Sequence, residues 1–185
     1  MNILAIYGSP RKDGNSAKML DAALSEFPQE ADARKVFLAD LNFVACCASR
    51  DCLELKYCSI DDDMQKLYQD MLWAEMIIIG TGSQFGDVTA ALKAMIERTW
   101  PLRGQLTNKI GGYVVSGRRY IESTLNTLHA FFLRHRMILG GSGALGYGLE
   151  SIDGDELAIR DSRKTGKRLV ELYQLVHGSG SQRQS

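Results

Sequence analysis

The chain has 185 residues, with 22 basic and 22 acidic side chains and 45% apolar residues. This length favours one globular domain, since domains usually hold roughly 100–200 residues. The balanced charge provides no general attraction for nucleic acid or for an acidic membrane surface, and no apolar run approaches the ~20 residues of a membrane helix. The chain starts without a basic leader, so we expect a cytoplasmic protein that binds neither nucleic acid nor membranes.

The first half of the chain predicts two strands and two helices. Residues 2–7 form an apolar run ended by Gly8, and apolar residues then recur at helical spacing from Leu20 to Phe27. A second strand is predicted at residues 35–41, followed by a cysteine-bearing insertion at about residues 43–60. Three aspartates at residues 61–63 then mark the start of a helix, because acidic side chains are favoured at the positive end of a helix dipole.

The second half of the chain continues the alternation. The remaining predicted strands lie at residues 76–81, 110–116 and 137–139, and an amphipathic helix follows each of them. Strands that alternate with helices in this way indicate an α/β fold, a doubly wound five-stranded parallel sheet with helices on both faces. We expect one such domain over residues 1–177 and a flexible tail over residues 178–185.

The loop after the first predicted strand, GSPRKDGNS, suits a phosphate group. Gly8 permits a sharp turn, while Ser9, Asn15 and Ser16 offer hydrogen bonds and Arg11 adds a guanidinium group. A loop of small residues that ends at a helix N-terminus also directs backbone N–H groups toward an anion, and Asn15 or Ser16 can cap that helix. The spacing differs from the phosphate loop of nucleotide triphosphatases, which argues against that class. A plain strand-to-helix turn is the alternative, but in a doubly wound sheet this loop lies beside the switch point where ligands bind.

The chain resembles the flavodoxin-like NADPH-dependent FMN reductases, and especially their iron-sulfur flavoprotein branch. The resemblance extends to about Leu175 and rests on GSPRKDGNS, the cysteine segment ending CSIDDDM, the helix ALKAMIERT, the loop VVSGRRYIESTL and the terminal GKRLVEL. It implies a flavodoxin-like fold that binds FMN and passes electrons from NAD(P)H through the flavin to a second acceptor. The flavin performs the chemistry in such enzymes, so no acid–base residue is required. The resemblance also implies a homodimer or homotetramer, since a second subunit often completes the pocket in this family.

Carried over by position, the resemblance assigns binding roles to three loops. It places the FMN phosphate against Ser9, Arg11, Gly14, Asn15 and Ser16. It lines one side of the flavin ring with Thr81, Gly82, Ser83, Gln84, Phe85 and Gly86. The other edge of the ring, or the entering nicotinamide, would meet Ser116, Gly117, Arg118, Arg119 and Tyr120. The two arginines are candidates for a phosphate of the pyridine nucleotide, with a solvated basic loop as the alternative.

The loop after the third predicted strand departs from the family pattern. In the family, a tyrosine usually stands where this chain has Gln84. An aromatic ring against the flavin contributes about 1 kcal/mol beyond area burial, so its loss is expected to weaken the cofactor without abolishing the site. Phe85 either takes over this role or belongs to the core.

The four cysteines, Cys46, Cys47, Cys52 and Cys58, also depart from the family pattern. Alignment with the cysteine run of iron-sulfur members puts Cys46 at the first ligand position and Ser49 at the second, which leaves Cys47 out of register. Four thiolates suit a [4Fe-4S] cluster. Zinc, a redox-active thiol pair and buried free cysteines are the alternatives.

Two other functional classes stay open beside the enzyme. One is a non-enzymatic flavodoxin-like electron carrier, although short-chain flavodoxins are typically acidic and this chain is neutral. The other is a flavin-free interaction protein on the same fold, which the Gln84 substitution motivates. The resemblance implies a nicotinamide nucleotide and an electron acceptor as partners, but the sequence determines neither the acceptor nor the choice between NADH and NADPH.

Overall fold

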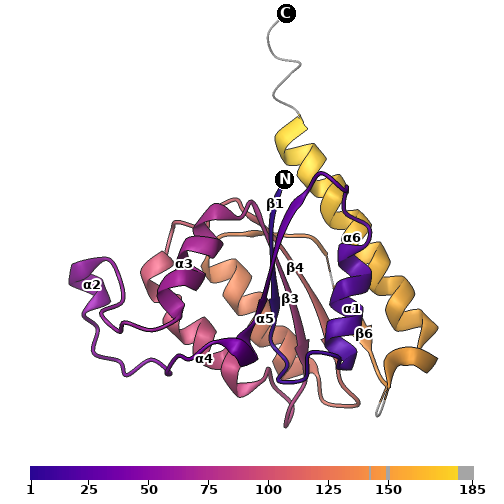
Figure 1. Ribbon diagram of the computed structural model, residues 1–185, viewed down its shortest axis with the longest axis horizontal. Coiled ribbons are helices and arrows are strands. Elements are labelled where there is room, and N and C mark those ends of the chain that lie inside the picture. Colours follow the sequence, from indigo (N-terminus) through magenta and orange to yellow (C-terminus); the bar gives the residue numbers. More distant parts are fainter. Residues whose placement is uncertain (142, 149–150, 179–185) are drawn as a thin grey trace, which may run out of the picture.

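The computed structural model describes residues 1–141, 143–148 and 151–178. They form one parallel sheet in the order β2-β1-β3-β4-β5, with helices on both faces (Figure 1). The strands are β1 (Asn2–Tyr7), β2 (Asp32–Phe37), β3 (Met76–Gly82), β4 (Ile110–Ser116), β5 (Ile138–Leu139) and β6 (Ala144–Gly146). The parallel pairing and the strand order confirm the predicted doubly wound sheet.

The fifth position of the sheet is shared by two short strands, β5 and β6, which both pair with β4. Ile138 lies opposite Ile110, whereas Ala144 lies opposite Val114. From the first of these pairs to the second, the outer strands advance six residues (138 to 144) while β4 advances four (110 to 114), so β5 and β6 pair with β4 in different registers. The prediction of a single strand at residues 137–139 captured only the first part of this edge.

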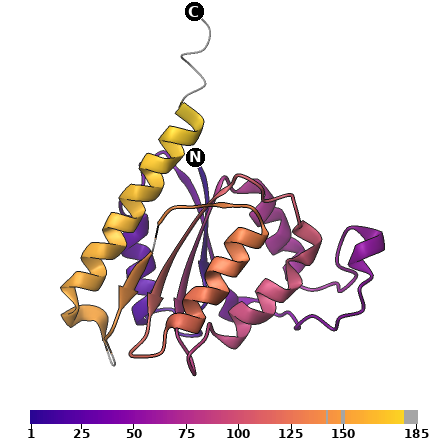
Figure 2. The same cartoon turned by 180° about the vertical axis from the view of Figure 1, so that it is seen from behind.

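The helices form a layer on each side of the sheet (Figures 1 and 2). On one side lie α1 (Asn15–Leu24) and α6 (Glu156–His177), and on the other α3 (Met64–Trp73), α4 (Ala90–Arg98) and α5 (Glu122–Arg134). Shorter helical segments are η1 (Leu38–Asp40), α2 (Cys52–Leu55), η2 (Trp100–Leu102) and η3 (Ile152–Gly154). No helix in the described ranges is both long and apolar enough to cross a bilayer.

Each helical layer closes its own apolar cluster against the sheet. Successive residues of β1 point to opposite faces, so Ile3 joins the cluster under α1 and α6 while Leu4 joins the cluster under α3, α4 and α5. Glycines in β4 allow close helix packing, because a Cβ at Gly111 would lie 2.5 Å from Cδ1 of Phe132 and one at Gly112 would lie 2.6 Å from Cδ1 of Leu169. The central strands are thus buried on both faces, as the sequence predicted for β3.

Two local predictions are wrong. The second strand covers Asp32–Phe37, where it pairs with β1 over its whole length, and the chain turns into η1 at Leu38, so the predicted range of residues 35–41 was shifted. The N-cap of α1 is Gly14, without any side-chain cap, so neither Asn15 nor Ser16 caps this helix.

The expected flexible tail lies, except for Gly178, outside the described residues.

Candidate flavin site

The loop between β1 and α1 is folded tightly at the carboxyl end of the sheet. The Gly8 N–H donates to the carbonyl oxygen of Gly80 at 2.8 Å, which ties the loop to β3. The Arg11 N–H donates to Oγ of Ser9 at 3.3 Å, and the Gly14 N–H donates to the Arg11 carbonyl at 3.3 Å. The Arg11 side chain is exposed while Gly14 is buried at the helix end. The loop therefore surrounds the N-terminus of α1 with a serine hydroxyl and an exposed guanidinium group.

The first turn of α1 has the chemistry of an anion site. In the described part of the chain, the N–H groups of Asn15 and Ser16 have no protein acceptor. Such first-turn N–H groups carry the positive end of the helix dipole. A Cβ at Gly14 would lie 3.2 Å from both Cβ and the carbonyl oxygen of Arg11, so a larger residue would crowd the turn. These residues fit a phosphate dianion such as that of FMN.

The side chain of Asn15 has a different environment from the one predicted. It is 6% exposed, donates from Nδ2 to the Gly148 carbonyl at 3.0 Å and accepts the Ile152 N–H at 2.9 Å through Oδ1. Lys18, one turn later, forms an ion pair with Asp153 at 2.7 Å. Asn15 thus ties the segment before α6 to the start of α1, and its backbone N–H is the group left for an anion.

The loop after β3 is a rigid two-residue turn. Gln84 and Asp87 exchange backbone hydrogen bonds of 2.7 and 3.1 Å, and the two residues between them, Phe85 and Gly86, both have positive φ (50° and 85°). Oδ1 of Asp87 accepts a hydrogen bond from Oγ1 of Thr127 at 2.8 Å, which fixes the turn to α5. The Phe85 side chain is fully exposed, which excludes the alternative that it belongs to the core.

The loop after β4 lies directly beside this turn. The Ser83 N–H donates to the Ser116 carbonyl at 2.8 Å, and a Cβ at Gly86 would be 3.5 Å from the Tyr120 carbonyl. Tyr120 has a positive φ of 57° and is 78% exposed. Arg118 and Arg119 are exposed and, among the described residues, form no ion pair. The three predicted loops therefore lie close together at the carboxyl ends of the strands.

Thr89 links two of these loops and was not identified from the sequence. It is the N-cap of α4, accepting the Leu92 N–H at 3.3 Å, and its hydroxyl donates to the carbonyl oxygen of Gly8. Thr89 is buried, so this hydrogen bond is shielded from water. A threonine that opens an apolar stripe is a recognisable N-cap signal, whereas its second partner, 81 residues away, has no sequence signature.

The cysteine segment projects from the α3 and α4 side of the molecule, with α2 near its tip (Figures 1 and 2). Cys46 and Cys47 are exposed, and Cys52 and Cys58 are half-buried, so burial does not account for the first two cysteines. Among the described residues, no three His, Cys, Asp or Glu side chains gather where they could hold a metal ion. This arrangement does not fit a cluster bound by four thiolates. The Ser49 backbone N–H lowers the pKa of the Cys47 thiol below its ordinary value.

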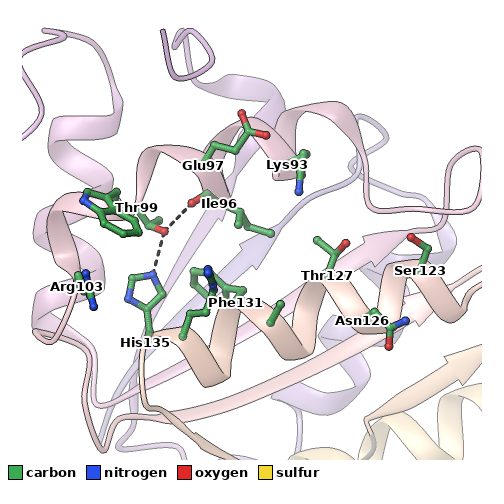
Figure 3. A pocket seen from close by; sticks show the side chains of 13 residues that line it. Lys93, Ile96, Glu97, Thr99, Arg103, Ser123, Asn126, Thr127, Phe131 and His135 are labelled. Atoms are coloured by element: carbon green, nitrogen blue, oxygen red, sulfur yellow. Dashed lines mark hydrogen bonds between the residues drawn. The ribbon is translucent and has the colours of Figure 1, made fainter. Parts of the chain in front are cut away.

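A separate groove of about 630 Å³ runs between α4 and α5 (Figure 3). At one end, the Thr99 hydroxyl donates to the Ile96 carbonyl at 2.7 Å and lies 2.9 Å from Nε2 of His135. Since the hydroxyl hydrogen is used, Nε2 must donate, and Nδ1 is left as a buried acceptor without a partner in the described structure. Burial lowers the pKa of His135. No residue predicted to bind the flavin lines this groove.

Comparison with known families identifies the family of the chain. Residues 1–149 match the model of the family described as NADPH-dependent FMN reductase. The chain belongs to the NADPH-dependent FMN reductase family. Its flavodoxin-like architecture and its family therefore agree with the expectations drawn from the sequence.

Curated relatives of this reductase family member are iron-sulfur flavoproteins. One from Methanocaldococcus jannaschii is 34% identical over 95% of this chain and 99% of the relative. Another from Methanosarcina thermophila is 31% identical over 95% of this chain and 97% of the relative. In both comparisons the similarity extends over nearly the whole length of the two chains.

Solved structures share the fold at low sequence identity. RosB with a bound formylriboflavin phosphate intermediate has a TM-score of 0.73 at 14% identity, covering 100% of this chain and 88% of RosB. An NAD(P)H:quinone oxidoreductase from Methanothermobacter marburgensis has a TM-score of 0.67 at 13% identity, covering 91% of this chain and 96% of that protein. These similarities establish the flavodoxin-like fold.

Proposed function

We propose that this protein is an FMN-binding oxidoreductase that takes electrons from NAD(P)H and passes them through the flavin to a second acceptor. The observation that carries the proposal is the anion site at the N-terminus of α1, placed beside the loops after β3 and β4. Ligands of doubly wound sheets bind at this edge, outside the carboxyl ends of the strands. Membership of the reductase family supports the same conclusion.

The phosphate loop would anchor the cofactor. Ser9 and Ser16 offer hydroxyl groups, Arg11 offers a guanidinium fork, and Gly14 lets the ligand approach the backbone. Asn15 contributes its backbone N–H, while its side chain keeps the segment around Gly148 and Ile152 in place. Bound FMN supplies hydride acceptance and electron donation, which no side chain of the protein could provide.

The two remaining loops would orient the ring and admit the nicotinamide. Residues 81–86 lie on one side, with the exposed Phe85 ring available in place of the missing tyrosine. Residues 116–120 lie on the other, and Arg118 and Arg119 are free to attract a phosphate of the pyridine nucleotide. Two such cations would favour NADPH over NADH, because NADPH carries one more phosphate group for them to bind. A homodimer or homotetramer that completes this pocket stays part of the proposal.

A pair of variants in one loop tests the phosphate site. Arg11→Ala removes the exposed guanidinium, and its neighbour Lys12→Ala removes an equal charge that is paired with Asp40 at 2.7 Å. Loss of a hydrogen bond to a charged group costs about 1.5–3 kcal/mol, so we expect Arg11→Ala to raise the FMN dissociation constant roughly 10- to 100-fold. Flavin fluorescence quenching measures this constant, and Lys12→Ala should change it less than about threefold.

Steady-state turnover separates the three functional classes. Protein reconstituted with FMN should oxidise NADPH continuously when a quinone or ferricyanide is supplied as electron acceptor. Bound flavin without continuous turnover would instead indicate an electron carrier. Protein that binds no added FMN would indicate an interaction protein on the same fold and would contradict the proposal.

A further inference from the structure

Arg98, the last residue of α4, carries a guanidinium group that is withdrawn from solvent. Its side chain is 0% exposed, although arginine is almost never fully buried unless it is paired. The residue lies in the helix ALKAMIERT, far in sequence from the segments that surround it. Its partners therefore show what the burial of this charge accomplishes.

In the described structure, the Arg98 guanidinium donates four hydrogen bonds, which reach both ends of the cysteine segment and Asp62 just beyond it. Nη1 donates to the Val44 carbonyl at 2.8 Å and to Oδ2 of Asp62 at 2.7 Å. Nη2 donates to Oδ1 of Asp62 at 3.0 Å and to the Ile60 carbonyl at 3.4 Å. Val44 precedes the four cysteines and Ile60 follows them. One side chain thus joins both ends of the segment in a bidentate clamp.

Neighbouring residues reinforce the same ends. Oδ2 of Asp63 accepts the Asn42 N–H at 2.6 Å, and Nε2 of Gln65 donates to the Cys58 and Ile60 carbonyls at 2.9 and 2.7 Å. Opening the segment would break these bonds and leave a buried guanidinium group without its carboxylate, which is strongly unfavourable. None of these contacts requires a metal ion.

The opposite end of α4 contacts the candidate phosphate site. Thr89, its N-cap, donates to the carbonyl oxygen of Gly8, and Arg98 ends the helix nine residues later. A straight helix rises 1.5 Å per residue, so α4 spans about 14 Å between these points. The helix is therefore a rigid link between the loop after β1 and the cysteine segment.

We propose that Arg98 is a positioning residue that closes the cysteine segment and holds it at a fixed place relative to the phosphate loop, without the help of a metal cluster. The inference concerns the position of the cysteine segment relative to the phosphate loop and does not depend on whether FMN binds. It explains how a segment whose thiols do not gather around a metal still keeps a defined position. Arg98 does this by bonding to the chain on both sides of the segment, at Val44 before the cysteines and at Asp62 after them.

Trypsin provides the test, because Arg50 and Lys56 are exposed inside the segment. We expect Arg98→Gln to accelerate cleavage after these two residues at least tenfold, as followed by mass spectrometry on the full chain. Arg98→Lys should recover part of the protection, because an ammonium group reaches Asp62 but cannot bridge both ends. Arg103→Gln is the matched control, because Arg103 is an exposed arginine that lies over the ring of Trp100. This variant should be cleaved after Arg50 and Lys56 at the wild-type rate.

Three further measurements keep the proposal falsifiable. Asp62→Asn retains the shape of the clamp without its charge, so its cleavage rates should lie between those of the wild type and Arg98→Gln. If Arg98→Gln fails to fold, the rates of Asp62→Asn still test the clamp. The FMN dissociation constant of each variant separates this proposal from the flavin proposal and should change less than twofold. Iron and acid-labile sulfide are measured on the same samples, before and after treatment with an iron chelator. Wild-type cleavage rates that rise to the Arg98→Gln level on chelation, or unchanged rates in both clamp variants, would overturn the proposal.

Discussion

Phe85 combines two properties that seldom occur together, a left-handed backbone and a fully exposed aromatic side chain. A bulky residue in this conformation is strained by roughly 1–2 kcal/mol. The turn is nevertheless fixed by the hydrogen bonds of Asp87 and Thr127, so the strain is maintained by its surroundings. Strained residues cluster at binding sites, which agrees with a role for the Phe85 ring beside the flavin.

Replacement of Phe85 should therefore separate stability from flavin binding. Asparagine tolerates the left-handed conformation, so Phe85→Asn is expected to leave the free energy of unfolding unchanged or to raise it by up to about 1 kcal/mol. Loss of the aromatic ring should weaken FMN binding roughly fivefold, equivalent to about 1 kcal/mol. Phe85→Tyr keeps a ring and should bind FMN like the wild type. Urea unfolding and fluorescence titration measure the two effects, and unchanged FMN affinity in Phe85→Asn would remove Phe85 from the site.

His135 should make stability depend on pH. Burial lowers its pKa in the folded protein, so the unfolded chain binds a proton more readily below the ordinary value of about 6.5. The free energy of unfolding should then fall as the pH drops from 7 to 5, with a contribution of at most about 1.4 kcal/mol per pH unit. His135→Gln should flatten this dependence in urea unfolding, whereas the exposed His177→Gln should not. Equal slopes in all three proteins would show that another group is responsible.

At the scale of elements, α1 and α6 approach one another through Gly166. A Cβ at this position would lie 2.1 Å from the carbonyl oxygen of Ala23, so a larger residue must push the helices apart. We expect Gly166→Ala to lower the free energy of unfolding by about 1–3 kcal/mol, despite the better helix propensity of alanine. Gly154→Ala is the control, since its Cβ would meet no atom within 4 Å. Chemical denaturation that gives equal midpoints for Gly166→Ala and the wild type would contradict this packing.

The sequence predicted elements well where burial was uniform and poorly where it was not. The predicted bounds of β1 and β4 match the structure, because both strands are apolar runs covered on two faces. In β2, an edge strand, the first residues Asp32, Ala33 and Arg34 are polar or small and exposed, so the apolar pattern began too late. β6 has only three residues within a glycine-rich stretch and no periodicity that could reveal it.

At the scale of the whole molecule, the fold brings three loops that are distant in sequence to one edge of the sheet. The loop after β1 could be predicted from its own residues, because it follows an apolar strand and contains turn residues, whereas the loops after β3 and β4 were assigned through the family resemblance. The roles of Asn15 and Arg98 could not be predicted, since their partners lie 133 and 36 positions away and only the assembled fold places them together. Residue type alone suggested that the Asn15 side chain binds the phosphate. In the structure, this side chain instead forms hydrogen bonds with the backbone of Gly148 and Ile152.

The central claim is that the N-terminus of α1 binds the phosphate of FMN. The most direct test compares the dissociation constants of FMN and riboflavin, which differ only by that phosphate, on the wild type and on Arg11→Ala. We expect the wild type to prefer FMN by at least about 100-fold, as two or more charge-assisted hydrogen bonds would provide, and Arg11→Ala to reduce this preference roughly 10- to 100-fold. Equal affinity of the wild type for the two ligands would contradict the account.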